Sequence, residues 1–359
     1  MGLFTKKRHV KPIFVGSYGN DLTRGIYVFH FDIDNGEFLK KKYYKSPANP
    51  SAFYKRERFI YVSYLNKTGK PTDGGLWQYA SMDLQFGLAS KTTNQGKTFI
   101  SSYVNEDRSC AYAVDYYNSE VVVIPILKQK IVKVVQTLKH EGHGPHGRYQ
   151  LQSHPTFIES TPDQKRIFVC DRGIDEIVLY RVVEKGRLER DEENTVRLKP
   201  GSGPRKMIFD DEGRYAYVLN ELSNTIATYC YEDTRFEYMG EVETYPLDRY
   251  DEESYASDIA FMNKDGRRFL FVTNKGHDSV SVFEIGNDGQ PHYIEFLDTD
   301  ENPVALITVN DRFVIVASQK GGTLESFELK LGESKGVLFE THYRYMVGEP
   351  VCLIEGRGI

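Results

Sequence analysis

The sequence predicts an all-β protein, a seven-bladed β-propeller whose first blade is closed by a C-terminal strand. Three observations lead to this prediction. Strand-like apolar runs recur about every fifty residues, each is followed by a polar turn and a second β-rich run, and one spare strand-like run remains near the C-terminus. A period of this size, built from short antiparallel strands, is typical of β-propellers.

The recurring runs share a valine near their end, and these valines lie 44 to 55 residues apart. They are Val15, Val62, Val114, Val169, Val218, Val272 and Val316. The second runs are expected at Gly25–Phe31, Gly75–Tyr79, Glu120–Ile126, Glu176–Val182, Thr225–Tyr231, Ser279–Ile285 and Thr323–Leu329. Aromatic residues make up 13% of the chain, which favours strands over helices.

Most runs are also preceded by a short apolar strand, as at His154–Ile158 and Asn302–Val309. The first run has none, because Val15 lies too near the N-terminus. Gly348–Ile354 supplies a spare strand of the same kind, and a ring closed by it leaves no open sheet edge. Two β-sandwiches are the alternative fold, but seven-fold recurrence favours the propeller. The repeats lack the Gly-His and Trp-Asp signature of WD40 propellers.

We therefore expect a basic tail at residues 1–10 and a single propeller domain at residues 11–359. The net charge of −5 argues against non-specific nucleic-acid binding. No run approaches the roughly 20 apolar residues of a membrane span, and the N-terminus lacks the apolar region of a signal peptide, so we expect a cytoplasmic protein.

Four widely spaced cysteines fit no metal or redox motif and are expected to be reduced core residues: Cys110, Cys170, Cys230 and Cys352.

Ring geometry predicts which polar residues meet. In each blade, the start of the first strand and the end of the second lie at the same face of the ring. These positions hold His154, Asp171, Arg172, Arg205, Lys206, Glu221, Asp258, Lys275 and Gln319, with Tyr18 and Tyr64 from the early blades. Arg205 and Lys275 suit a carboxylate or phosphate, Glu221 is a candidate general base, and His154 is a candidate acid or base. A purely structural ion-pair network of Arg205, Glu221 and Lys275 is the alternative.

A histidine-rich stretch at residues 140–148 resembles a metal site in its residue content. Its three glycines and one proline indicate a loop, and neither a helical histidine pair nor a cysteine accompanies it. We expect no metal here and no cofactor elsewhere. The stretch is interpreted as a loop over the channel mouth, from which Arg148 can reach an anion.

The chain resembles the seven-bladed propeller lactonase family, which contains bacterial 6-phosphogluconolactonases and fungal carboxy-cis,cis-muconate cyclases. The resemblance spans nearly the whole chain and is carried by six motifs: residues 140–148, Ser153-His154-Pro155, Thr161-Pro162-Asp163, residues 201–205, Asn220-Glu221-Leu222 and residues 274–279. It implies a site made of His154, Arg205, Glu221 and Lys275, where Lys275 replaces the usual arginine. Three family histidines are replaced here, by Thr156, Lys206 and Ala260.

The resemblance implies a metal-independent lactonase acting on a sugar-acid lactone, with 6-phosphogluconolactone as the expected substrate. Arg148, Arg172 and Lys206 are expected to assist in binding this small anion, and Glu221 or His154 to activate water. Two alternatives remain open: a muconate-type lactonising cyclase, and a non-catalytic ligand-binding propeller. We expect a monomer or homodimer that binds neither nucleic acid nor membranes.

Overall fold

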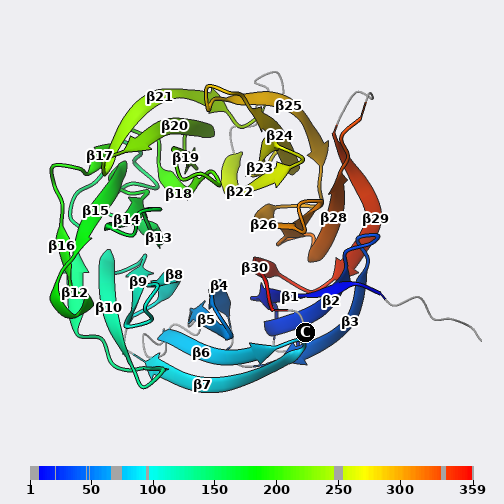
Figure 1. The fold of residues 1–359 in the computed structure, drawn as a ribbon, viewed down its shortest axis with the longest axis horizontal. Helices are drawn as coiled ribbons and strands as arrows, with labels where there is room; N and C mark the ends of the chain where they lie inside the picture. The colour runs from blue at the N-terminus through cyan, green and yellow to red at the C-terminus, as the bar shows by residue number, and fades with distance from the viewer. Residues whose placement is uncertain are drawn as a thin grey trace, which may run out of the picture.

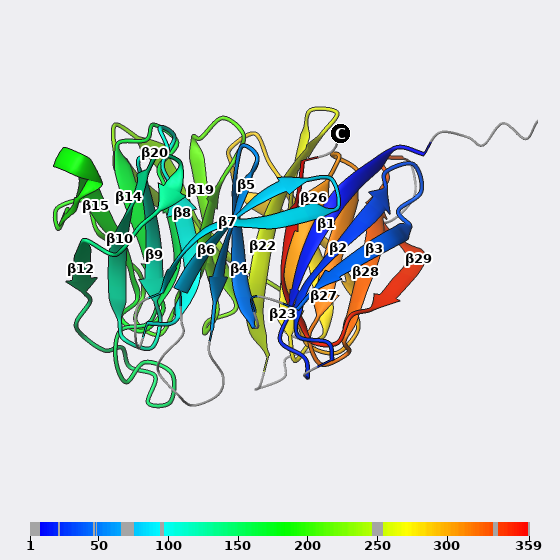
Figure 2. The ribbon, with the colours of Figure 1, turned by 90° about the horizontal axis from the view of Figure 1, so that it is seen from below.

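The chain forms a ring of seven antiparallel sheets, the blades, around a central axis (Figure 1). The structure is a computed structural model that describes residues 8–20, 22–45, 47, 49–65, 75–93, 97–245, 254–332 and 337–357. Most of the basic tail predicted at residues 1–10 lies outside these ranges. The predicted seven-bladed propeller is confirmed. In side view the strands run between the two faces of the ring (Figure 2).

In blade 1 the C-terminal strand β30 lies nearest the axis. In every other blade the strand that comes first in the sequence does (Figure 1). Blade 1 contains β30 (Pro350–Glu355), β1 (Val10–Ser17), β2 (Gly25–Asp32) and β3 (Phe38–Tyr44). Blade 2 contains β4 (Pro50–Arg56), β5 (Phe59–Tyr64), β6 (Gly75–Met82) and β7 (Gln85–Thr93). Blade 3 contains β8 (Phe99–Val104), β9 (Cys110–Asp115) and β10 (Glu120–Leu127), with β11 (Lys130–Ile131) and β12 (Gln136–Lys139) both paired to β10.

Blade 4 contains β13 (Pro155–Ser160), β14 (Arg166–Asp171), β15 (Glu176–Val182), the short 3-10 helix η1 (Glu184–Gly186), β16 (Leu188–Arg190) and β17 (Val196–Arg197). Blade 5 contains β18 (Pro204–Phe209), β19 (Tyr215–Asn220), β20 (Thr225–Glu232) and β21 (Arg235–Glu243). Blade 6 contains β22 (Tyr255–Lys264), β23 (Arg267–Lys275), β24 (Ser279–Ile285) and β25 (Pro291–Asp298). Blade 7 contains β26 (Pro303–Val309), β27 (Phe313–Ser318), β28 (Thr323–Leu329) and β29 (Leu338–Met346).

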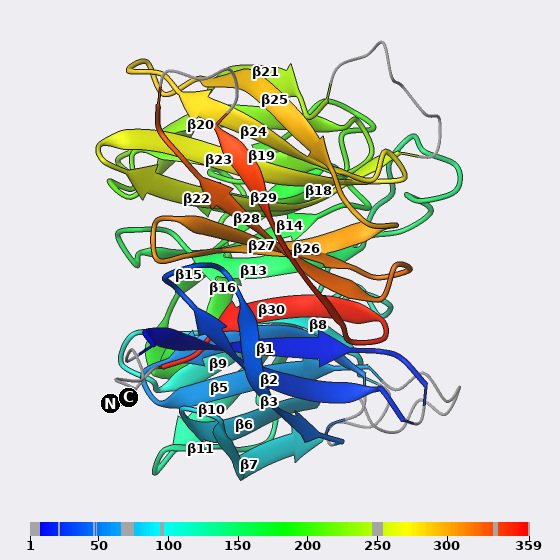
Figure 3. The same ribbon diagram turned by 90° about the vertical axis from the view of Figure 1, so that its right-hand side faces the viewer.

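The ring closes as expected, because β30 adds to β1 as the innermost strand of blade 1 (Figure 3). Ile13 pairs with Glu355 and Phe14 with Ile354 in an antiparallel register. The blade therefore joins strands from the two ends of the sequence, and β1 has no unpaired edge.

The hydrophobic core lies between the blades. The described buried residues form seven apolar clusters, and each cluster joins two neighbouring blades. Phe31 of blade 1, for example, packs edge-on against Phe313 of blade 7 with ring centroids 5.4 Å apart. The four cysteines are unpaired; three are buried and Cys230 is partly exposed. Within the described ranges, none of the helical segments has the length and apolar character needed to span a bilayer.

Every innermost strand carries a register shift of one residue near its start. The shift leaves one unpaired residue per blade, and these bulge residues are Ser51, Ile100, Thr156, Arg205, Ser257, Val304 and Val351. A bulge bends the strand and re-aims the side chain of the extra residue. The same backbone feature is thus repeated seven times around the axis with five different residue types.

Candidate active site

A cavity of about 550 Å³ lies at the centre of the ring. All seven bulge residues line it. A second set of seven residues also lines it. In each blade the residue just before the bulge pairs with a residue near the end of the neighbouring strand, and the residue after that partner belongs to the set. The set is Tyr18, Leu65, Tyr116, Arg172, Glu221, Lys275 and Gln319. Because each second strand returns antiparallel to the first, these two rings meet at one face of the propeller, as the sequence predicted. We call this face the mouth of the channel.

Glu221 and two arginines form the centre of the charged wall. Arg205 Nη1 donates to Glu221 Oε2 at 3.0 Å, and Arg172 Nη1 donates to the same oxygen at 3.1 Å. Arg205 Nε donates to the Ser257 carbonyl oxygen, and Arg172 Nη2 donates to the Tyr116 hydroxyl. The Glu221 side chain is only 5% exposed, whereas that of Arg205 is 35% exposed. A ligand in the cavity therefore meets the guanidinium groups more readily than the carboxylate.

These contacts fix the charge of Glu221. Burial favours a higher pKa, but the positive charges of Arg205, Arg172 and Lys275 outweigh it and lower the Glu221 pKa to about 2. Because this value lies below the ordinary 4.5, Glu221 stabilises the fold above pH 4.5, and the contribution is lost as the pH falls towards 2. The group thus carries three cations and one permanent anion, a net charge of about +2, which favours an anionic ligand.

Lys275 and Lys206 differ in their availability. Lys275 Nζ lies 5.3 Å from the centre of the Tyr255 ring and forms no ion pair with any carboxylate in the described part of the chain. Burial, followed by the nearby arginines, lowers its pKa, although Glu221 opposes the shift. Lys206 Nζ instead donates to Asp258 Oδ1 at 2.7 Å, so its charge is neutralised within the wall.

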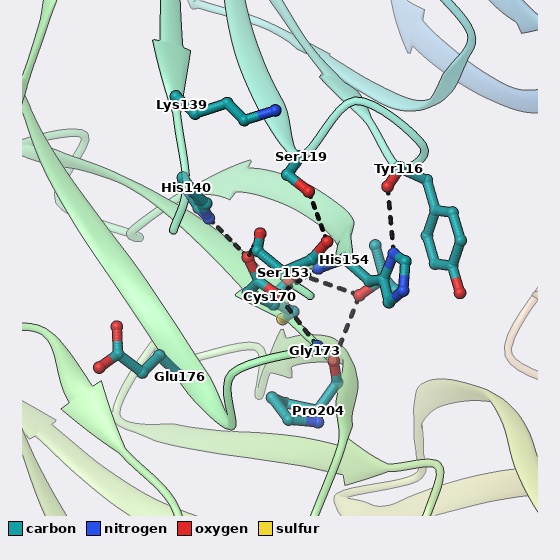
Figure 4. Close-up of polar contacts among 12 residues, drawn as sticks. Tyr116, Ser119, Lys139, His140, Ser153, His154, Cys170, Gly173, Glu176 and Pro204 are labelled. Atoms are coloured by element: carbon teal, nitrogen blue, oxygen red, sulfur yellow. Dashed lines mark hydrogen bonds and ion pairs between the residues drawn. The ribbon is translucent and has the colours of Figure 1, made fainter. Parts of the chain in front are cut away.

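His154 is not among the residues that line the cavity. Figure 4 shows it beside Tyr116. Its ring stacks on Tyr116 at 4.3 Å, and its Nδ1 donates to the Tyr116 carbonyl oxygen at 3.2 Å. Burial lowers the His154 pKa, so the ring is neutral at pH 7 and its Nε2 can accept a proton. Tyr116, which stacks on this ring, itself lines the cavity, and its hydroxyl accepts from Arg172.

Asp171 is a buried structural centre and not a channel residue. Its carboxylate accepts hydrogen bonds from His140 Nδ1 (2.6 Å), Ser153 Oγ (2.6 Å) and the backbone N–H of His154 (2.7 Å). His140 Nε2 contacts the Tyr180 hydroxyl at 2.5 Å. Burial raises the Asp171 pKa, but these hydrogen bonds prevail and lower it. The network positions the backbone that carries His154.

The histidine-rich stretch forms a loop, with His140 buried in the Asp171 network and His143 exposed. Arg148 is exposed and covers the Tyr149 ring at 5.0 Å, outside the cavity wall. Tyr149 in turn lies 5.6 Å from the Arg172 guanidinium. The described residues contain no cluster of three or more His, Cys, Asp or Glu side chains that could hold a metal ion.

The structure thus brings Arg172, Arg205, Glu221 and Lys275 together. His154 and Arg148 lie outside the cavity lining, whereas Lys206 lines the cavity but is paired with Asp258. The ion-pair network considered from the sequence exists, but Arg172 takes the place expected for Lys275. Sequence reasoning missed Tyr116, which contacts both Arg172 and His154. A signal was available, because Tyr116 follows the strand end of blade 3 as Arg172 follows that of blade 4.

The chain belongs to a family of lactone-hydrolysing propellers. A family profile described as lactonase, 7-bladed beta-propeller, matches residues 12–355. This extent spans all seven blades, including the closing strand.

Among named relatives, a 6-phosphogluconolactonase of Bacillus subtilis is 28% identical over 325 residues, covering 88% of this chain and 90% of the relative. An uncharacterized protein of Staphylococcus epidermidis is 29% identical and covers 95% of this chain and 98% of its own length. The solved structure of a periplasmic gluconolactonase from Pseudomonas aeruginosa superimposes with a TM-score of 0.88 at 25% identity, covering 97% of this chain and 99% of that one.

Proposed function

We propose that this protein hydrolyses a phosphorylated sugar lactone, with 6-phosphogluconolactone as the substrate, in the central channel. The observation that carries the proposal is the net positive cluster at the mouth, where two arginines share one buried carboxylate and Lys275 remains unpaired among the described residues. The Bacillus subtilis relative, named for this activity, supports the choice of substrate.

In this mechanism Arg205, Arg172 and Lys275 bind the anionic substituent and stabilise the oxyanion that forms when water attacks the lactone carbonyl. Glu221 acts chiefly as a positioning residue, because its carboxylate is buried and holds both guanidinium groups. Neutral His154 is the proton acceptor, held against the cavity-lining Tyr116 by ring stacking and by the hydrogen bond from its Nδ1 to the Tyr116 carbonyl oxygen. Lys206 supports the wall through Asp258, and Arg148 attracts the anion from the surface.

The test is hydrolysis of freshly generated 6-phosphogluconolactone, measured against the uncatalysed rate. We expect wild type to accelerate the reaction, and Glu221→Gln and Arg205→Ala to remove most of the acceleration. Arg235→Ala, on the outer strand of blade 5, is the matched control and should behave as wild type. If wild type and all variants follow the uncatalysed rate, the proposal is wrong. Assaying a carboxymuconate substrate in parallel tests the cyclase alternative.

The cytoplasmic location and the monomeric or dimeric state remain predictions. Cell fractionation and light scattering of the purified protein test them directly.

A further inference from the structure

A second carboxyl group faces the channel at a deeper level than Glu221. Glu159 lies on β13, three residues beyond the bulge residue Thr156, and lines the same cavity. At about 3.3 Å per strand residue, it lies roughly 10 Å further along the channel. The equivalent positions of the other six innermost strands are Tyr54, Tyr103, Ile208, Ala260, Ile307 and Ile354. Glu159 is thus the one carboxylic acid among these seven positions, and Tyr54 is the other member that lines the cavity.

Three carboxyl groups line the described part of the cavity wall, and they differ in their partners. Glu221 is bonded by two arginines and Asp258 by Lys206. Glu159 has no cation within ion-pair distance among the described residues; its Oε1 accepts only the backbone N–H of Ser160, at 3.2 Å.

The two cations nearest Glu159 are committed to other acceptors. Arg56 donates through Nε and Nη2 to the Val104 carbonyl oxygen, and Lys206 donates to Asp258. Tyr103, a buried core residue that interacts electrostatically with Glu159, donates its hydroxyl proton to Gln164 Oε1 at 2.7 Å. Burial therefore dominates over the weak attraction of Arg56 and Lys206, and the Glu159 pKa rises to about 8.

We propose that Glu159 is a substrate-binding residue. Its carboxyl group binds the ligand when the group is protonated and uncharged, and repels the ligand when it is ionised. In the acid form, its O–H donates a hydrogen bond to the hydroxyl-bearing part of a sugar acid whose anionic group meets Arg172, Arg205 and Lys275. Ionisation removes this donor and adds a negative charge facing the anionic ligand. The inference rests on the proposed function, since it requires an anionic polyhydroxylated ligand in the channel.

Binding of 6-phosphogluconate, the hydrolysis product, tests this without the spontaneous reaction of the lactone. Calorimetric titrations between pH 7 and pH 9 keep its phosphate fully ionised, because the second phosphate pKa is about 6. Lys275 also loses charge as the pH rises, since its pKa is lowered. The reference protein is therefore Lys275→Arg, which retains a cation throughout this range.

We expect the dissociation constant of Lys275→Arg to rise about tenfold per pH unit above pH 8, because only the protonated fraction of Glu159 binds. Glu159→Gln is then added to Lys275→Arg, because its amide keeps a donor but cannot ionise. In this double variant the dissociation constant should rise less than about twofold over the whole pH range. Its affinity at pH 7 should stay within about threefold of that of Lys275→Arg. Adding Glu106→Gln, an exposed residue after β8, should leave the rise unchanged. An equal rise with and without Glu159→Gln overturns the inference.

A ligand-free measurement separates this result from failure of the proposed function. The folded pKa of Glu159 lies above its ordinary 4.5, so the folded protein holds the extra proton between about pH 4.5 and 8. The free energy of unfolding of wild type should therefore fall relative to Glu159→Gln across this window. No relative fall overturns the inference whatever the ligand result. The wild type could instead show this fall in the free energy of unfolding and yet neither bind 6-phosphogluconate at pH 7 nor hydrolyse the lactone. That result would reject both the proposed function and the binding role of Glu159.

Discussion

The two halves of the channel wall share one backbone plan but carry opposite chemistry. Blades 4 to 6 present Arg172, Arg205, Glu221 and Lys275, whereas β26 of blade 7 and β30 of blade 1 present an apolar set: Val304, Ala305, Val351, Cys352 and Leu353. Arg205 and Val304 occupy the same bulge position in their blades. The difference shows that the propeller supplies equivalent places and that side-chain choice at a few of them determines where charge can be bound.

The largest effect is expected from removing an arginine on the charged side. Arg172→Met and Arg205→Met should each lower kcat/KM for 6-phosphogluconolactone by about 10²- to 10³-fold, as for loss of an oxyanion-stabilising donor, about 2.7–4 kcal/mol. Each also leaves Glu221 with one charged partner. Steady-state kinetics with thermal unfolding as a folding control measure this. Losses below about fivefold in folded variants would contradict a catalytic role for the charged side.

Lys275 allows binding to be separated from chemistry on the same side. Lys275→Met should raise KM by roughly 10- to 100-fold, since a hydrogen bond to a charged group contributes about 1.5–3 kcal/mol, with a smaller change in kcat. Lys275→Arg should recover most of the affinity. An equal fall in kcat would instead assign Lys275 to the transition state.

The pH profile distinguishes the two acid–base candidates. If His154 accepts the proton, kcat/KM falls about tenfold per pH unit below a pKa that lies under the ordinary 6.5. Glu221, with a pKa of about 2, gives no such limb above pH 3. We expect the His154 limb in wild type and its absence from His154→Gln.

The substrate itself can produce a limb in this range, because a phosphate monoester has its second pKa near 6. Repeating the profile with unphosphorylated gluconolactone removes this contribution. A limb that persists unchanged in His154→Gln with that substrate would exclude His154 as the base.

The smallest effect is expected on the apolar side. Val304→Ala and Val351→Ala remove two methyl groups from partly exposed positions, so kcat/KM should change by less than about threefold. Parallel kinetics with the arginine variants measure the contrast directly. A loss above tenfold would show that the apolar side shapes the substrate as strongly as the charged side binds it.

The sequence was sufficient to predict the ring, its closure and the face on which the charges meet. Each second run begins at the residue expected, from Gly25 in β2 to Thr323 in β28, because turn chemistry and apolar period both repeat in the sequence. Arg205 and Glu221 were placed together by counting positions in the repeat alone.

Other features depend on side-chain geometry that no period encodes. Asp171 and Arg172 are adjacent in sequence, yet one turns into the buried His140 network and the other into the cavity. Lys206 looked like a ligand for the substrate, but Asp258 from the next blade neutralises it. The raised pKa of Glu159 depends on its burial and on Arg56 and Lys206 being paired elsewhere, and could not be read from its own segment.

Closure by β30 also constrains the order in which the protein can be completed during translation. Among the described strands β1 comes first in the chain, but it has no inner partner until Pro350–Glu355 has been synthesised. Until then its edge is open to pairing with other chains. The same six residues place Val351 and Leu353 in the cavity wall, so an interrupted chain is both exposed to aggregation and without a finished binding chamber.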